Sequence, residues 1–292
     1  MEGLAPIDVW ALLAIFVKAA GYAAALVAMG GPLFVLVFRS ALDNVLRLVR
    51  KLAVSAALLG LFVLALQFGI RSARISGMGL EGAIDPMMLG LLWDSPLGMA
   101  ALWRGAGQLL IFAVLIKGKI GLAVSLLGAL LVAVSYTLVG HSLGDPRWLL
   151  AAIVTVHLLA GAFWVGALVP LHCAVGLTGG ALLLHRFGII ASGTVAVLVL
   201  AGLTFAWLMI GSLAELFGTA YGWLFMTKLA LVTGLLGLAA KNKLRLVPSL
   251  ASGDSSAPGR LRRSICLEII AVALILLATS TLTSITTPPV NL

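Results

Sequence analysis

The sequence predicts an all-α, polytopic membrane protein: a bundle of eight transmembrane helices. Of its 292 residues, 62% are hydrophobic and only 10% are charged, and the mean hydropathy is +1.19. A soluble domain carries roughly a quarter charged residues, so this chain cannot present a water-compatible surface on all sides. The composition excludes a cytosolic enzyme and a disordered chain. The two cysteines, Cys173 and Cys266, are too few for a disulfide framework.

The individual helices follow from the length of the apolar segments. A hydrocarbon core of about 30 Å requires about 20 apolar residues per helix. Eight segments meet this requirement: about 8–38, 52–70, 97–116, 120–140, 148–171, 187–211, 221–240 and 264–287. We expect them to form one integral membrane domain over residues 1–292.

The basic residues predict how the bundle is oriented. Thirteen of the nineteen Lys and Arg residues fall in loops on one side of the predicted bundle. They are Arg39, Arg47, Arg50, Lys51, Lys117, Lys119, Arg186, Lys241, Lys243, Arg245, Arg260, Arg262 and Arg263. The positive-inside rule makes this side cytoplasmic, including the basic loop 241–263, and places both termini outside. The net charge of +9 is thereby explained by basic residues that hold loops on the cytoplasmic side of the lipid bilayer, and no nucleic-acid partner is expected.

The largest outer loop, about 71–96, is apolar, and we expect it to fold back onto the bundle as a lid. It contains Met78, Met87 and Met88, and Met99 follows shortly after it. Their thioethers suit a soft ion such as Cu(I). Methionine also fills irregular packing gaps, so a purely structural role for these side chains stays open.

Ionisable residues inside the predicted spans are the main candidates for a functional site, because charge at membrane depth is costly. Lys18, Arg104, His157 and Lys228 lie within spans, and Glu268 lies near the cytoplasmic start of the last one. A rise of about 1.5 Å per residue puts the first four about 10–14 Å below the outer ends of their helices. We therefore expect one polar pocket that opens outward.

Each of these residues also has a simpler interpretation. Arg104 and Lys228 are long enough to reach the outer headgroups. Glu268 can pair with basic side chains at the inner interface. A lone core histidine is usually just hydrogen-bonded, but His157 has few partners in mid-bilayer, which favours a ligand or proton-relay role. Trp164 lies seven residues further along the same helix face. His141 ends the fourth span, where it either captures a metal ion or is an interfacial histidine without a ligand.

The chain resembles the copper resistance D (CopD) family of bacterial inner-membrane proteins over most of its length. Gly140-His141 resembles the family's GH, and the segment from His157 to Gly166 resembles HLxxxxxWxGGL. Further matches are Arg186-Phe187, Thr219-Ala220-Tyr221-Gly222, Lys228, Lys241-Asn242-Lys243, Pro248, Glu268 and Pro288-Pro289. The sequence departs from the family at Lys18, where members often have a histidine, and at Ala167, where the family has a glycine.

The resemblance implies copper handling at the inner (plasma) membrane, with a periplasmic copper-binding protein as partner. It makes His141 and His157 candidate copper ligands, to which the outer Met88 and Met99 are added from their chemistry. Trp164, Lys228 and Glu268 are then supporting family positions, and Lys18 and Arg104 are supporting residues because of their charge at membrane depth. No Walker lysine motif or phosphorylated-aspartate motif is present, so we expect passive or potential-driven Cu(I) uptake toward the cytoplasm and no enzyme activity.

Two other functions fit parts of the sequence. A haem-binding membrane redox protein would use His141 and His157 as axial ligands, although such a site needs two histidines at matching depth. A copper-holding assembly factor would bind the ion without transporting it. A Soret band identifies the first alternative, and binding without flux identifies the second.

Overall fold

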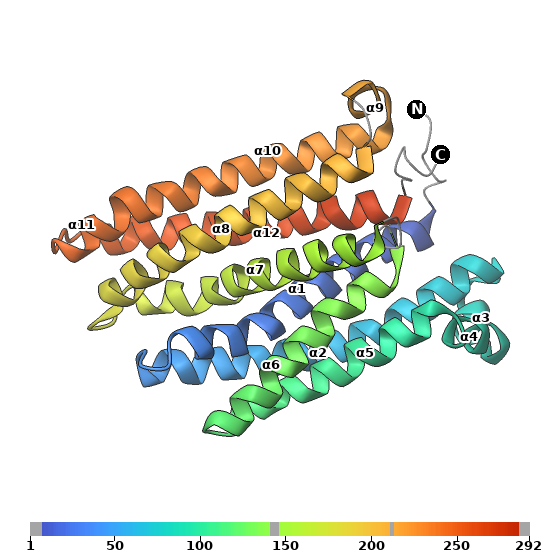
Figure 1. Ribbon diagram of the computed structural model, residues 1–292, viewed down its shortest axis with the longest axis horizontal. Helices are drawn as coiled ribbons and strands as arrows, with labels where there is room; N and C mark the ends of the chain where they lie inside the picture. The colour runs from blue at the N-terminus through green and yellow to red at the C-terminus, as the bar shows by residue number, and fades with distance from the viewer. Residues whose placement is uncertain (1–7, 141–145, 211–212, 286–292) are drawn as a thin grey trace.

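The computed structural model describes residues 8–140, 146–210 and 213–285, and every regular element in these ranges is helical. Eight helical segments in the described ranges are long and apolar enough to cross a membrane. This confirms the predicted all-α, polytopic membrane fold. The eight long helices are α1 (Val9–Val37), α2 (Asp43–Ser76), α5 (Pro96–Ile111), α6 (Lys119–Ser135), α7 (Arg147–Ala174), α8 (Gly180–Ile210), α10 (Ala220–Lys241) and α12 (Ala257–Ile285) (Figure 1).

Short helical pieces extend or join these long helices. 3₁₀ turns over Phe112–Leu115 and Tyr136–Leu138 continue α5 and α6. A π-helical segment, Asn242–Leu246, continues α10 into the short helix α11 (Val247–Ala251). Helix α9 (Leu213–Gly218) precedes α10.

Several helices run beyond the apolar segments found in the sequence. Helix α2 begins at Asp43 and α8 at Gly180, and α10 continues through the π-helical segment. Hydropathy marks only the part of a helix inside the hydrocarbon core, whereas backbone hydrogen bonding continues into the headgroup region. The polar ends of membrane helices are therefore missed by an apolar-length criterion.

The segment 71–96 is mostly helical rather than a loop. Its first residues complete α2, and α3 (Gly79–Ala83) and α4 (Pro86–Trp93) follow. Helix α3 packs against α2, and α4 packs against both α2 and α5. The segment therefore folds back onto the outer end of α2 and α5.

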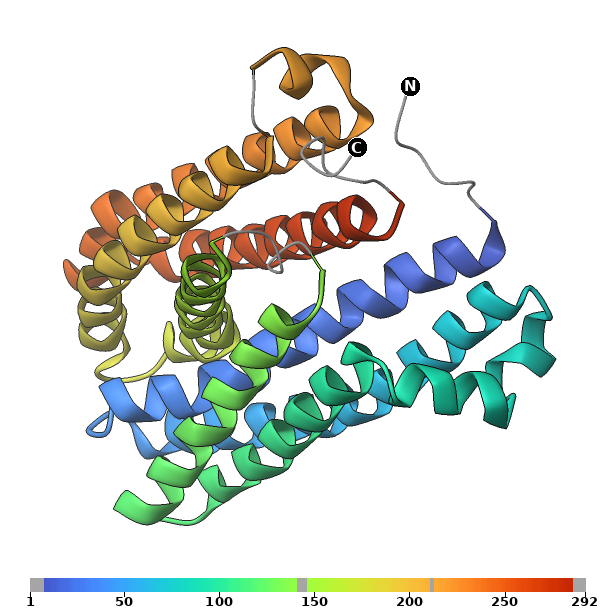
Figure 2. The same cartoon turned by 45° about the vertical axis from the view of Figure 1, so that its right-hand side comes forward.

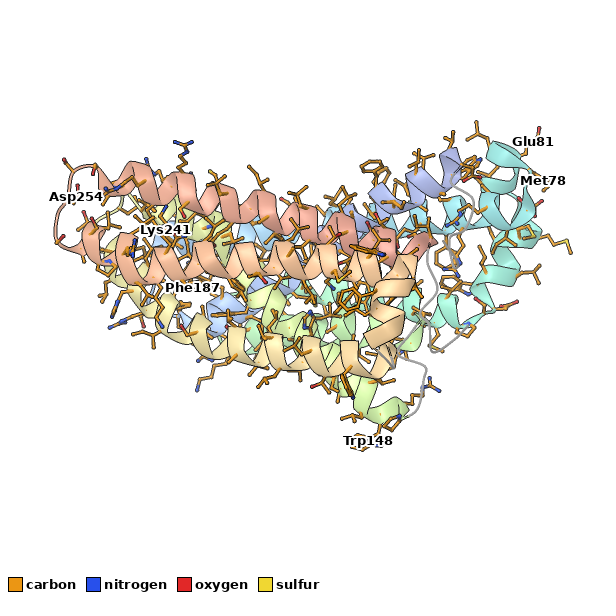
Figure 3. The ribbon with its side chains drawn as sticks, turned by 90° about the horizontal axis from the view of Figure 1, so that it is seen from above. Met78, Glu81, Trp148, Phe187, Lys241 and Asp254 are labelled. Atoms are coloured by element: carbon orange, nitrogen blue, oxygen red, sulfur yellow. The ribbon has the colours of Figure 1, made fainter. Side chains whose placement is uncertain are left out.

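The two ends of the bundle differ in the charges they carry. Helices α3, α4 and α9 lie at one end and α11 at the other (Figure 1). Met78 and Glu81 lie at the first end, and Lys241 and Asp254 at the opposite one (Figure 3). The turns 38–42, 116–118, 175–179 and 252–256 share the α11 end, and the predicted cytoplasmic basic residues lie at or near these turns. We refer to the end with α3 and α4 as the outer end.

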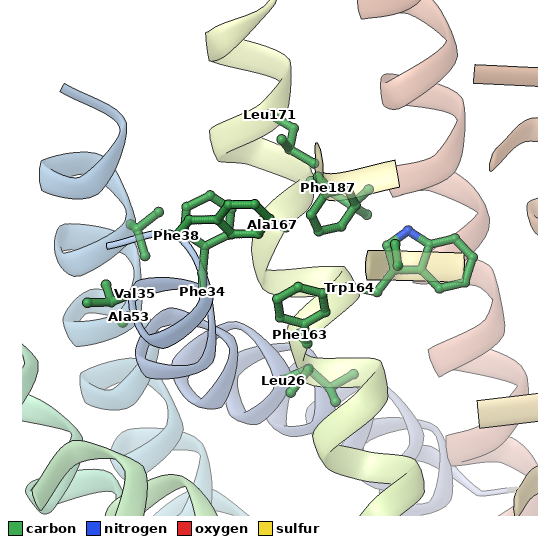
Figure 4. Packing of buried hydrophobic residues seen from close by; sticks show 14 of the residues in the cluster. Leu26, Phe34, Val35, Phe38, Ala53, Phe163, Trp164, Ala167, Leu171 and Phe187 are labelled. Carbon is green, nitrogen blue, oxygen red and sulfur yellow. The ribbon is translucent and has the colours of Figure 1, made fainter. Parts of the chain in front are cut away.

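Helix α1 is the centre of the bundle. Helices α2, α5 and α6 lie on one side of it, and α7, α8, α10 and α12 on the other (Figure 2). Four phenylalanines pack where α1 meets α7 and α8: Phe34 and Phe38 have ring centroids 4.8 Å apart, and Phe163 and Phe187 have theirs 5.5 Å apart (Figure 4). All four side chains are buried, so the core of the bundle is aromatic at its inner half.

Glycines allow two pairs of helices to approach closely. A Cβ built on Gly166 of α7 would lie 2.7 Å from the Cα of Gly30 on α1. A Cβ built on Gly107 of α5 would lie 2.7 Å from the carbonyl oxygen of Gly128 on α6. Small residues at such contacts let membrane helices gain van der Waals packing, which drives their association in lipid.

Candidate functional site

His157 lies near the middle of α7 and faces α8. Its Nδ1 is 3.1 Å from the carbonyl oxygen of Leu198. The imidazole fits there because Gly202 has no side chain: a Cβ built on Gly202 would lie 3.3 Å from the His157 Cε1. The histidine is therefore seated in a groove on α8 made by a glycine.

The Leu198 contact determines which nitrogen of His157 is available to a ligand. A carbonyl oxygen only accepts hydrogen bonds, so Nδ1 carries the proton and donates it. In the neutral ring the Nε2 then keeps its lone pair. Metal-binding histidines commonly donate their other ring N–H to a carbonyl in this way, which fixes the tautomer and the ring orientation.

Lys228 of α10 is close enough to His157 for its charge to act on the imidazole. The imidazole is thus in contact with the backbone of α8 and within electrostatic range of Lys228 on α10. Two of the residues singled out in the sequence, His157 and Lys228, therefore act on each other through their charges.

A second polar cluster lies deeper along the same helix. Trp164 follows His157 by seven residues, which is about 10 Å further toward the inner end. The Glu268 carboxylate on α12 accepts a 2.6 Å hydrogen bond from the Asn242 amide, and the Trp164 indole also donates to it. Glu268 is 4% exposed and Asn242 8% exposed. Glu268 therefore has buried partners within the bundle.

Asn242 lies where α10 passes into the π-helical segment. Such segments occur frequently at functional sites. Asn242 is the first residue of this one, Asn242–Leu246. With its amide N–H directed to Glu268, its buried Oδ1 has no hydrogen-bond partner among the described residues. The cluster thus holds a carboxylate and a free amide oxygen.

Lys18 and Arg104 line a third polar site, a cavity at the outer end of the bundle. The Lys18 Nζ donates a 2.9 Å hydrogen bond to the carbonyl oxygen of Thr283. The Arg104 Nε donates to the Ser135 hydroxyl at 3.1 Å, and the guanidinium lies 3.8 Å from the ring centroid of Tyr136. Both cations line one cavity, and His157 and Lys228 are not among its lining residues. The single outward pocket expected from helix depth is thus divided between two places.

The remaining predicted metal ligands are not brought to His157. His141 lies outside the described residues. Met88 is half-buried on α4, and Met99 on α5 is 53% exposed. Helix α4 packs against α2 and α5, whereas His157 faces α8. In the described ranges, no three His, Cys, Asp or Glu side chains form a group able to hold a metal ion.

Sequence reasoning gave no site role to three residues that the structure places at these clusters. Asn242 is one; it was noted in the sequence only as part of the family-like run Lys241-Asn242-Lys243 at the end of an apolar helix. Arg71 and Arg74 are the others, because the predicted loop began at residue 71. Their three-residue spacing puts them on one face once α2 is seen to continue to Ser76.

The fold and these clusters define a class: a polytopic helical membrane protein with ionisable side chains at three levels of the bundle. Residues 7–146 match the family model described as "Copper resistance protein D-like, N-terminal domain", and residues 181–282 match the one described as "Copper resistance protein D". The chain belongs to the copper resistance protein D family. No curated protein and no solved structure matches it.

Proposed function

We propose that this protein carries copper as Cu(I) across the bacterial inner membrane, from the periplasm toward the cytoplasm, without enzymatic activity. The observation that supports this most directly is the seating of His157. Its Nδ1–H is committed to Leu198, so Nε2 is the nitrogen left for a ligand at mid-bilayer depth. Imidazole nitrogen is an established donor for copper ions.

The inner cluster supports the inward direction of this proposal. Glu268 accepts a hydrogen bond from Trp164, which lies about two helical turns beyond His157 on α7. A carboxylate lowers the energy of a cation in a medium of low dielectric constant. The buried Oδ1 of Asn242 adds a second acceptor beside it. A cation released from Nε2 would meet these two oxygens on its way to the inner end.

The driving force in this proposal is the membrane potential. An inward field contributes about 2.3 kcal/mol per unit charge per 100 mV. Acidic side chains at the outer end, such as Glu81, Asp85 and Asp94, raise the local concentration of cations there. In this scheme the periplasmic partner delivers copper at that end, and His141, Met88 and Met99 are the candidate first ligands.

The test is Cu(I) uptake into proteoliposomes with an inside-negative potential. His157→Ala is expected to reduce uptake to the rate of empty vesicles. His157→Asn is the sharper variant, because its amide N–H can still donate to Leu198 while the Nε2 ligand is lost. Loss of uptake in both variants supports the ligand role, and wild-type uptake in either one refutes it.

A control variant, a copper analysis and an absorbance spectrum complete this test. His185→Ala removes an exposed imidazole of α8 at the inner end and is expected to leave uptake unchanged. Copper content and visible absorbance of the purified protein distinguish the other functions. A Soret band would replace copper transport with haem binding, and stoichiometric copper without uptake would replace it with copper holding.

A further inference from the structure

The cavity at the outer end of the bundle is lined by four cationic side chains. It has a volume of about 460 Å³ and lies among α1, α2, α4, α5 and α12. Lys18 comes from α1, Arg71 and Arg74 from α2, and Arg104 from α5. Three separate helices thus direct positive charge to one space.

Two of the four cations are fixed in place by neutral partners. Lys18 donates to the Thr283 carbonyl oxygen, and Arg104 donates through Nε to Ser135 while its plane lies over Tyr136. These contacts orient both side chains and leave their charge uncompensated. If the Arg104 side chain turned toward the headgroups, it would lose its contacts with both Ser135 and Tyr136.

The other two cations are more exposed than Lys18 and Arg104. Arg71 and Arg74 are exposed and one helical turn apart near the end of α2. The charges of Arg71, Arg74 and Arg104 all repel that of Lys18, so the four cations are close enough to interact electrostatically. Bringing like charges together in a membrane is unfavourable unless an opposite charge joins them.

No carboxylate among the described residues supplies that opposite charge. The described lining of the cavity contains no Asp or Glu. The ion pair found within the described ranges, Arg260 with Asp254, lies at the opposite end of the bundle. The rest of the described lining is apolar apart from Gln67, Thr283 and Ser284.

We propose that this cavity binds an anion that carries a phosphate-type oxyanion group. Guanidinium groups match the geometry of such oxygens through paired N–H donors, and Lys18 adds a point charge. The apolar wall, which includes Leu64, Phe68 and Leu97, accommodates a hydrocarbon portion if the group belongs to a lipid. The shared chemistry is the oxyanion, and its source is either a membrane phospholipid or a free anion.

This site is separate from the copper path and does not rest on the proposed transport function. Four positive charges raise the energy of any free cation in the cavity, and His157 does not line it. A protein that failed to transport copper would still be expected to bind the anion here. Conversely, loss of the anion site would leave the His157 interpretation untouched.

Two binding measurements on the full-length protein, purified in a neutral detergent, test the proposal. Inorganic phosphate is titrated by calorimetry at constant ionic strength, with chloride as the replaced ion. Retention of phosphatidylglycerol against phosphatidylcholine is measured by native mass spectrometry. Saturable phosphate binding identifies a free anion, and selective retention of phosphatidylglycerol without phosphate binding identifies a lipid headgroup; either result supports the oxyanion site.

Variants locate the binding to the cavity. The double variant Arg71→Gln with Arg104→Gln is expected to weaken binding of the positive probe by about tenfold or more. Arg147→Gln removes the same charge from an exposed residue outside the cavity and is expected to have no effect. If the double variant does not fold, Arg71→Gln alone, at an exposed position, carries the test. Binding of neither probe, or equal weakening by Arg147→Gln, overturns the proposal.

Discussion

Replacing Gly166 with alanine is expected to destabilise the bundle by about 1–3 kcal/mol, the usual cost of overpacking a core. The new Cβ would lie 2.7 Å from the Cα and 3.1 Å from the carbonyl carbon of Gly30. Non-bonded carbons prefer about 3.5–4.0 Å, so α1 and α7 would have to separate by about 1 Å at this point. The atoms that clash belong to the backbone of α1 and cannot rotate away.

A second glycine provides a matched control for this substitution. Gly234 of α10 is exposed, and a Cβ built on it meets no atom within 4 Å. Gly234→Ala is therefore expected to be neutral or to stabilise by up to about 1 kcal/mol, the difference in helix propensity. The same chemical change thus has opposite signs at the two positions.

The free energy of unfolding of both variants can be measured by titrating sodium dodecyl sulfate into mixed micelles and following tryptophan fluorescence. A lower midpoint for Gly166→Ala, beside an unchanged or higher one for Gly234→Ala, supports the close α1–α7 contact. If Gly166→Ala were as stable as Gly234→Ala, the two helices would not approach at these glycines and the packing described above would be wrong.

Three further predictions concern the inner cluster, the 252–256 turn and the orientation. Asn242→Leu is expected to lower the unfolding free energy by about 1–3 kcal/mol because it removes one of the two donors to the buried Glu268. Glu268→Leu in the same chain should recover part of the loss, and an unchanged midpoint for Asn242→Leu alone would contradict this. Hydrogen bonds from the Ser256 hydroxyl and N–H, and from the Ser249 hydroxyl, hold the pKa of Asp254 well below its ordinary value. Because the pKa of this carboxyl is lower in the folded protein than in the unfolded chain, its ionised form stabilises the fold above the unfolded pKa of about 3.9. This stabilisation is lost as the pH falls through the folded pKa. The difference in thermal midpoint between wild type and Asp254→Asn should therefore be constant above about pH 4 and shrink below it; a difference that grows on acidification would refute the assignment. In a chain without its native cysteines, a membrane-impermeant thiol reagent applied to whole cells should label Met78→Cys and spare Asp254→Cys; the reverse pattern would invert the predicted orientation.

The helices themselves could be predicted because their signal is local. A run of about 20 apolar residues crosses a bilayer whatever its neighbours are, since the backbone must satisfy its own hydrogen bonds there. The same signal fails at helix ends, as at Arg71 and Arg74, where polar residues continue a helix outside the hydrocarbon core. Depth along each helix was also readable, because it depends only on the rise per residue.

The partners of the buried polar residues could not be predicted. Lys18 and His157 lie at similar depths in the sequence interpretation, but one hydrogen-bonds to α12 and the other to α8. Which face of a helix meets which neighbour depends on packing across the whole bundle, for example on whether Gly202 leaves room for an imidazole. Neither helix depth nor residue type carries that information.

The sequence by itself therefore determined the class of protein, the number of membrane-crossing helices and which residues are out of place in a bilayer, because these depend on composition and short-range periodicity. The tertiary structure alone decided how those residues are grouped. It seated His157 against Leu198, joined Glu268 to Asn242, and gathered four cations around one outer cavity. The physical reason is that helix rotation and close approach are set by contacts between residues far apart in the chain, such as Gly30 with Gly166.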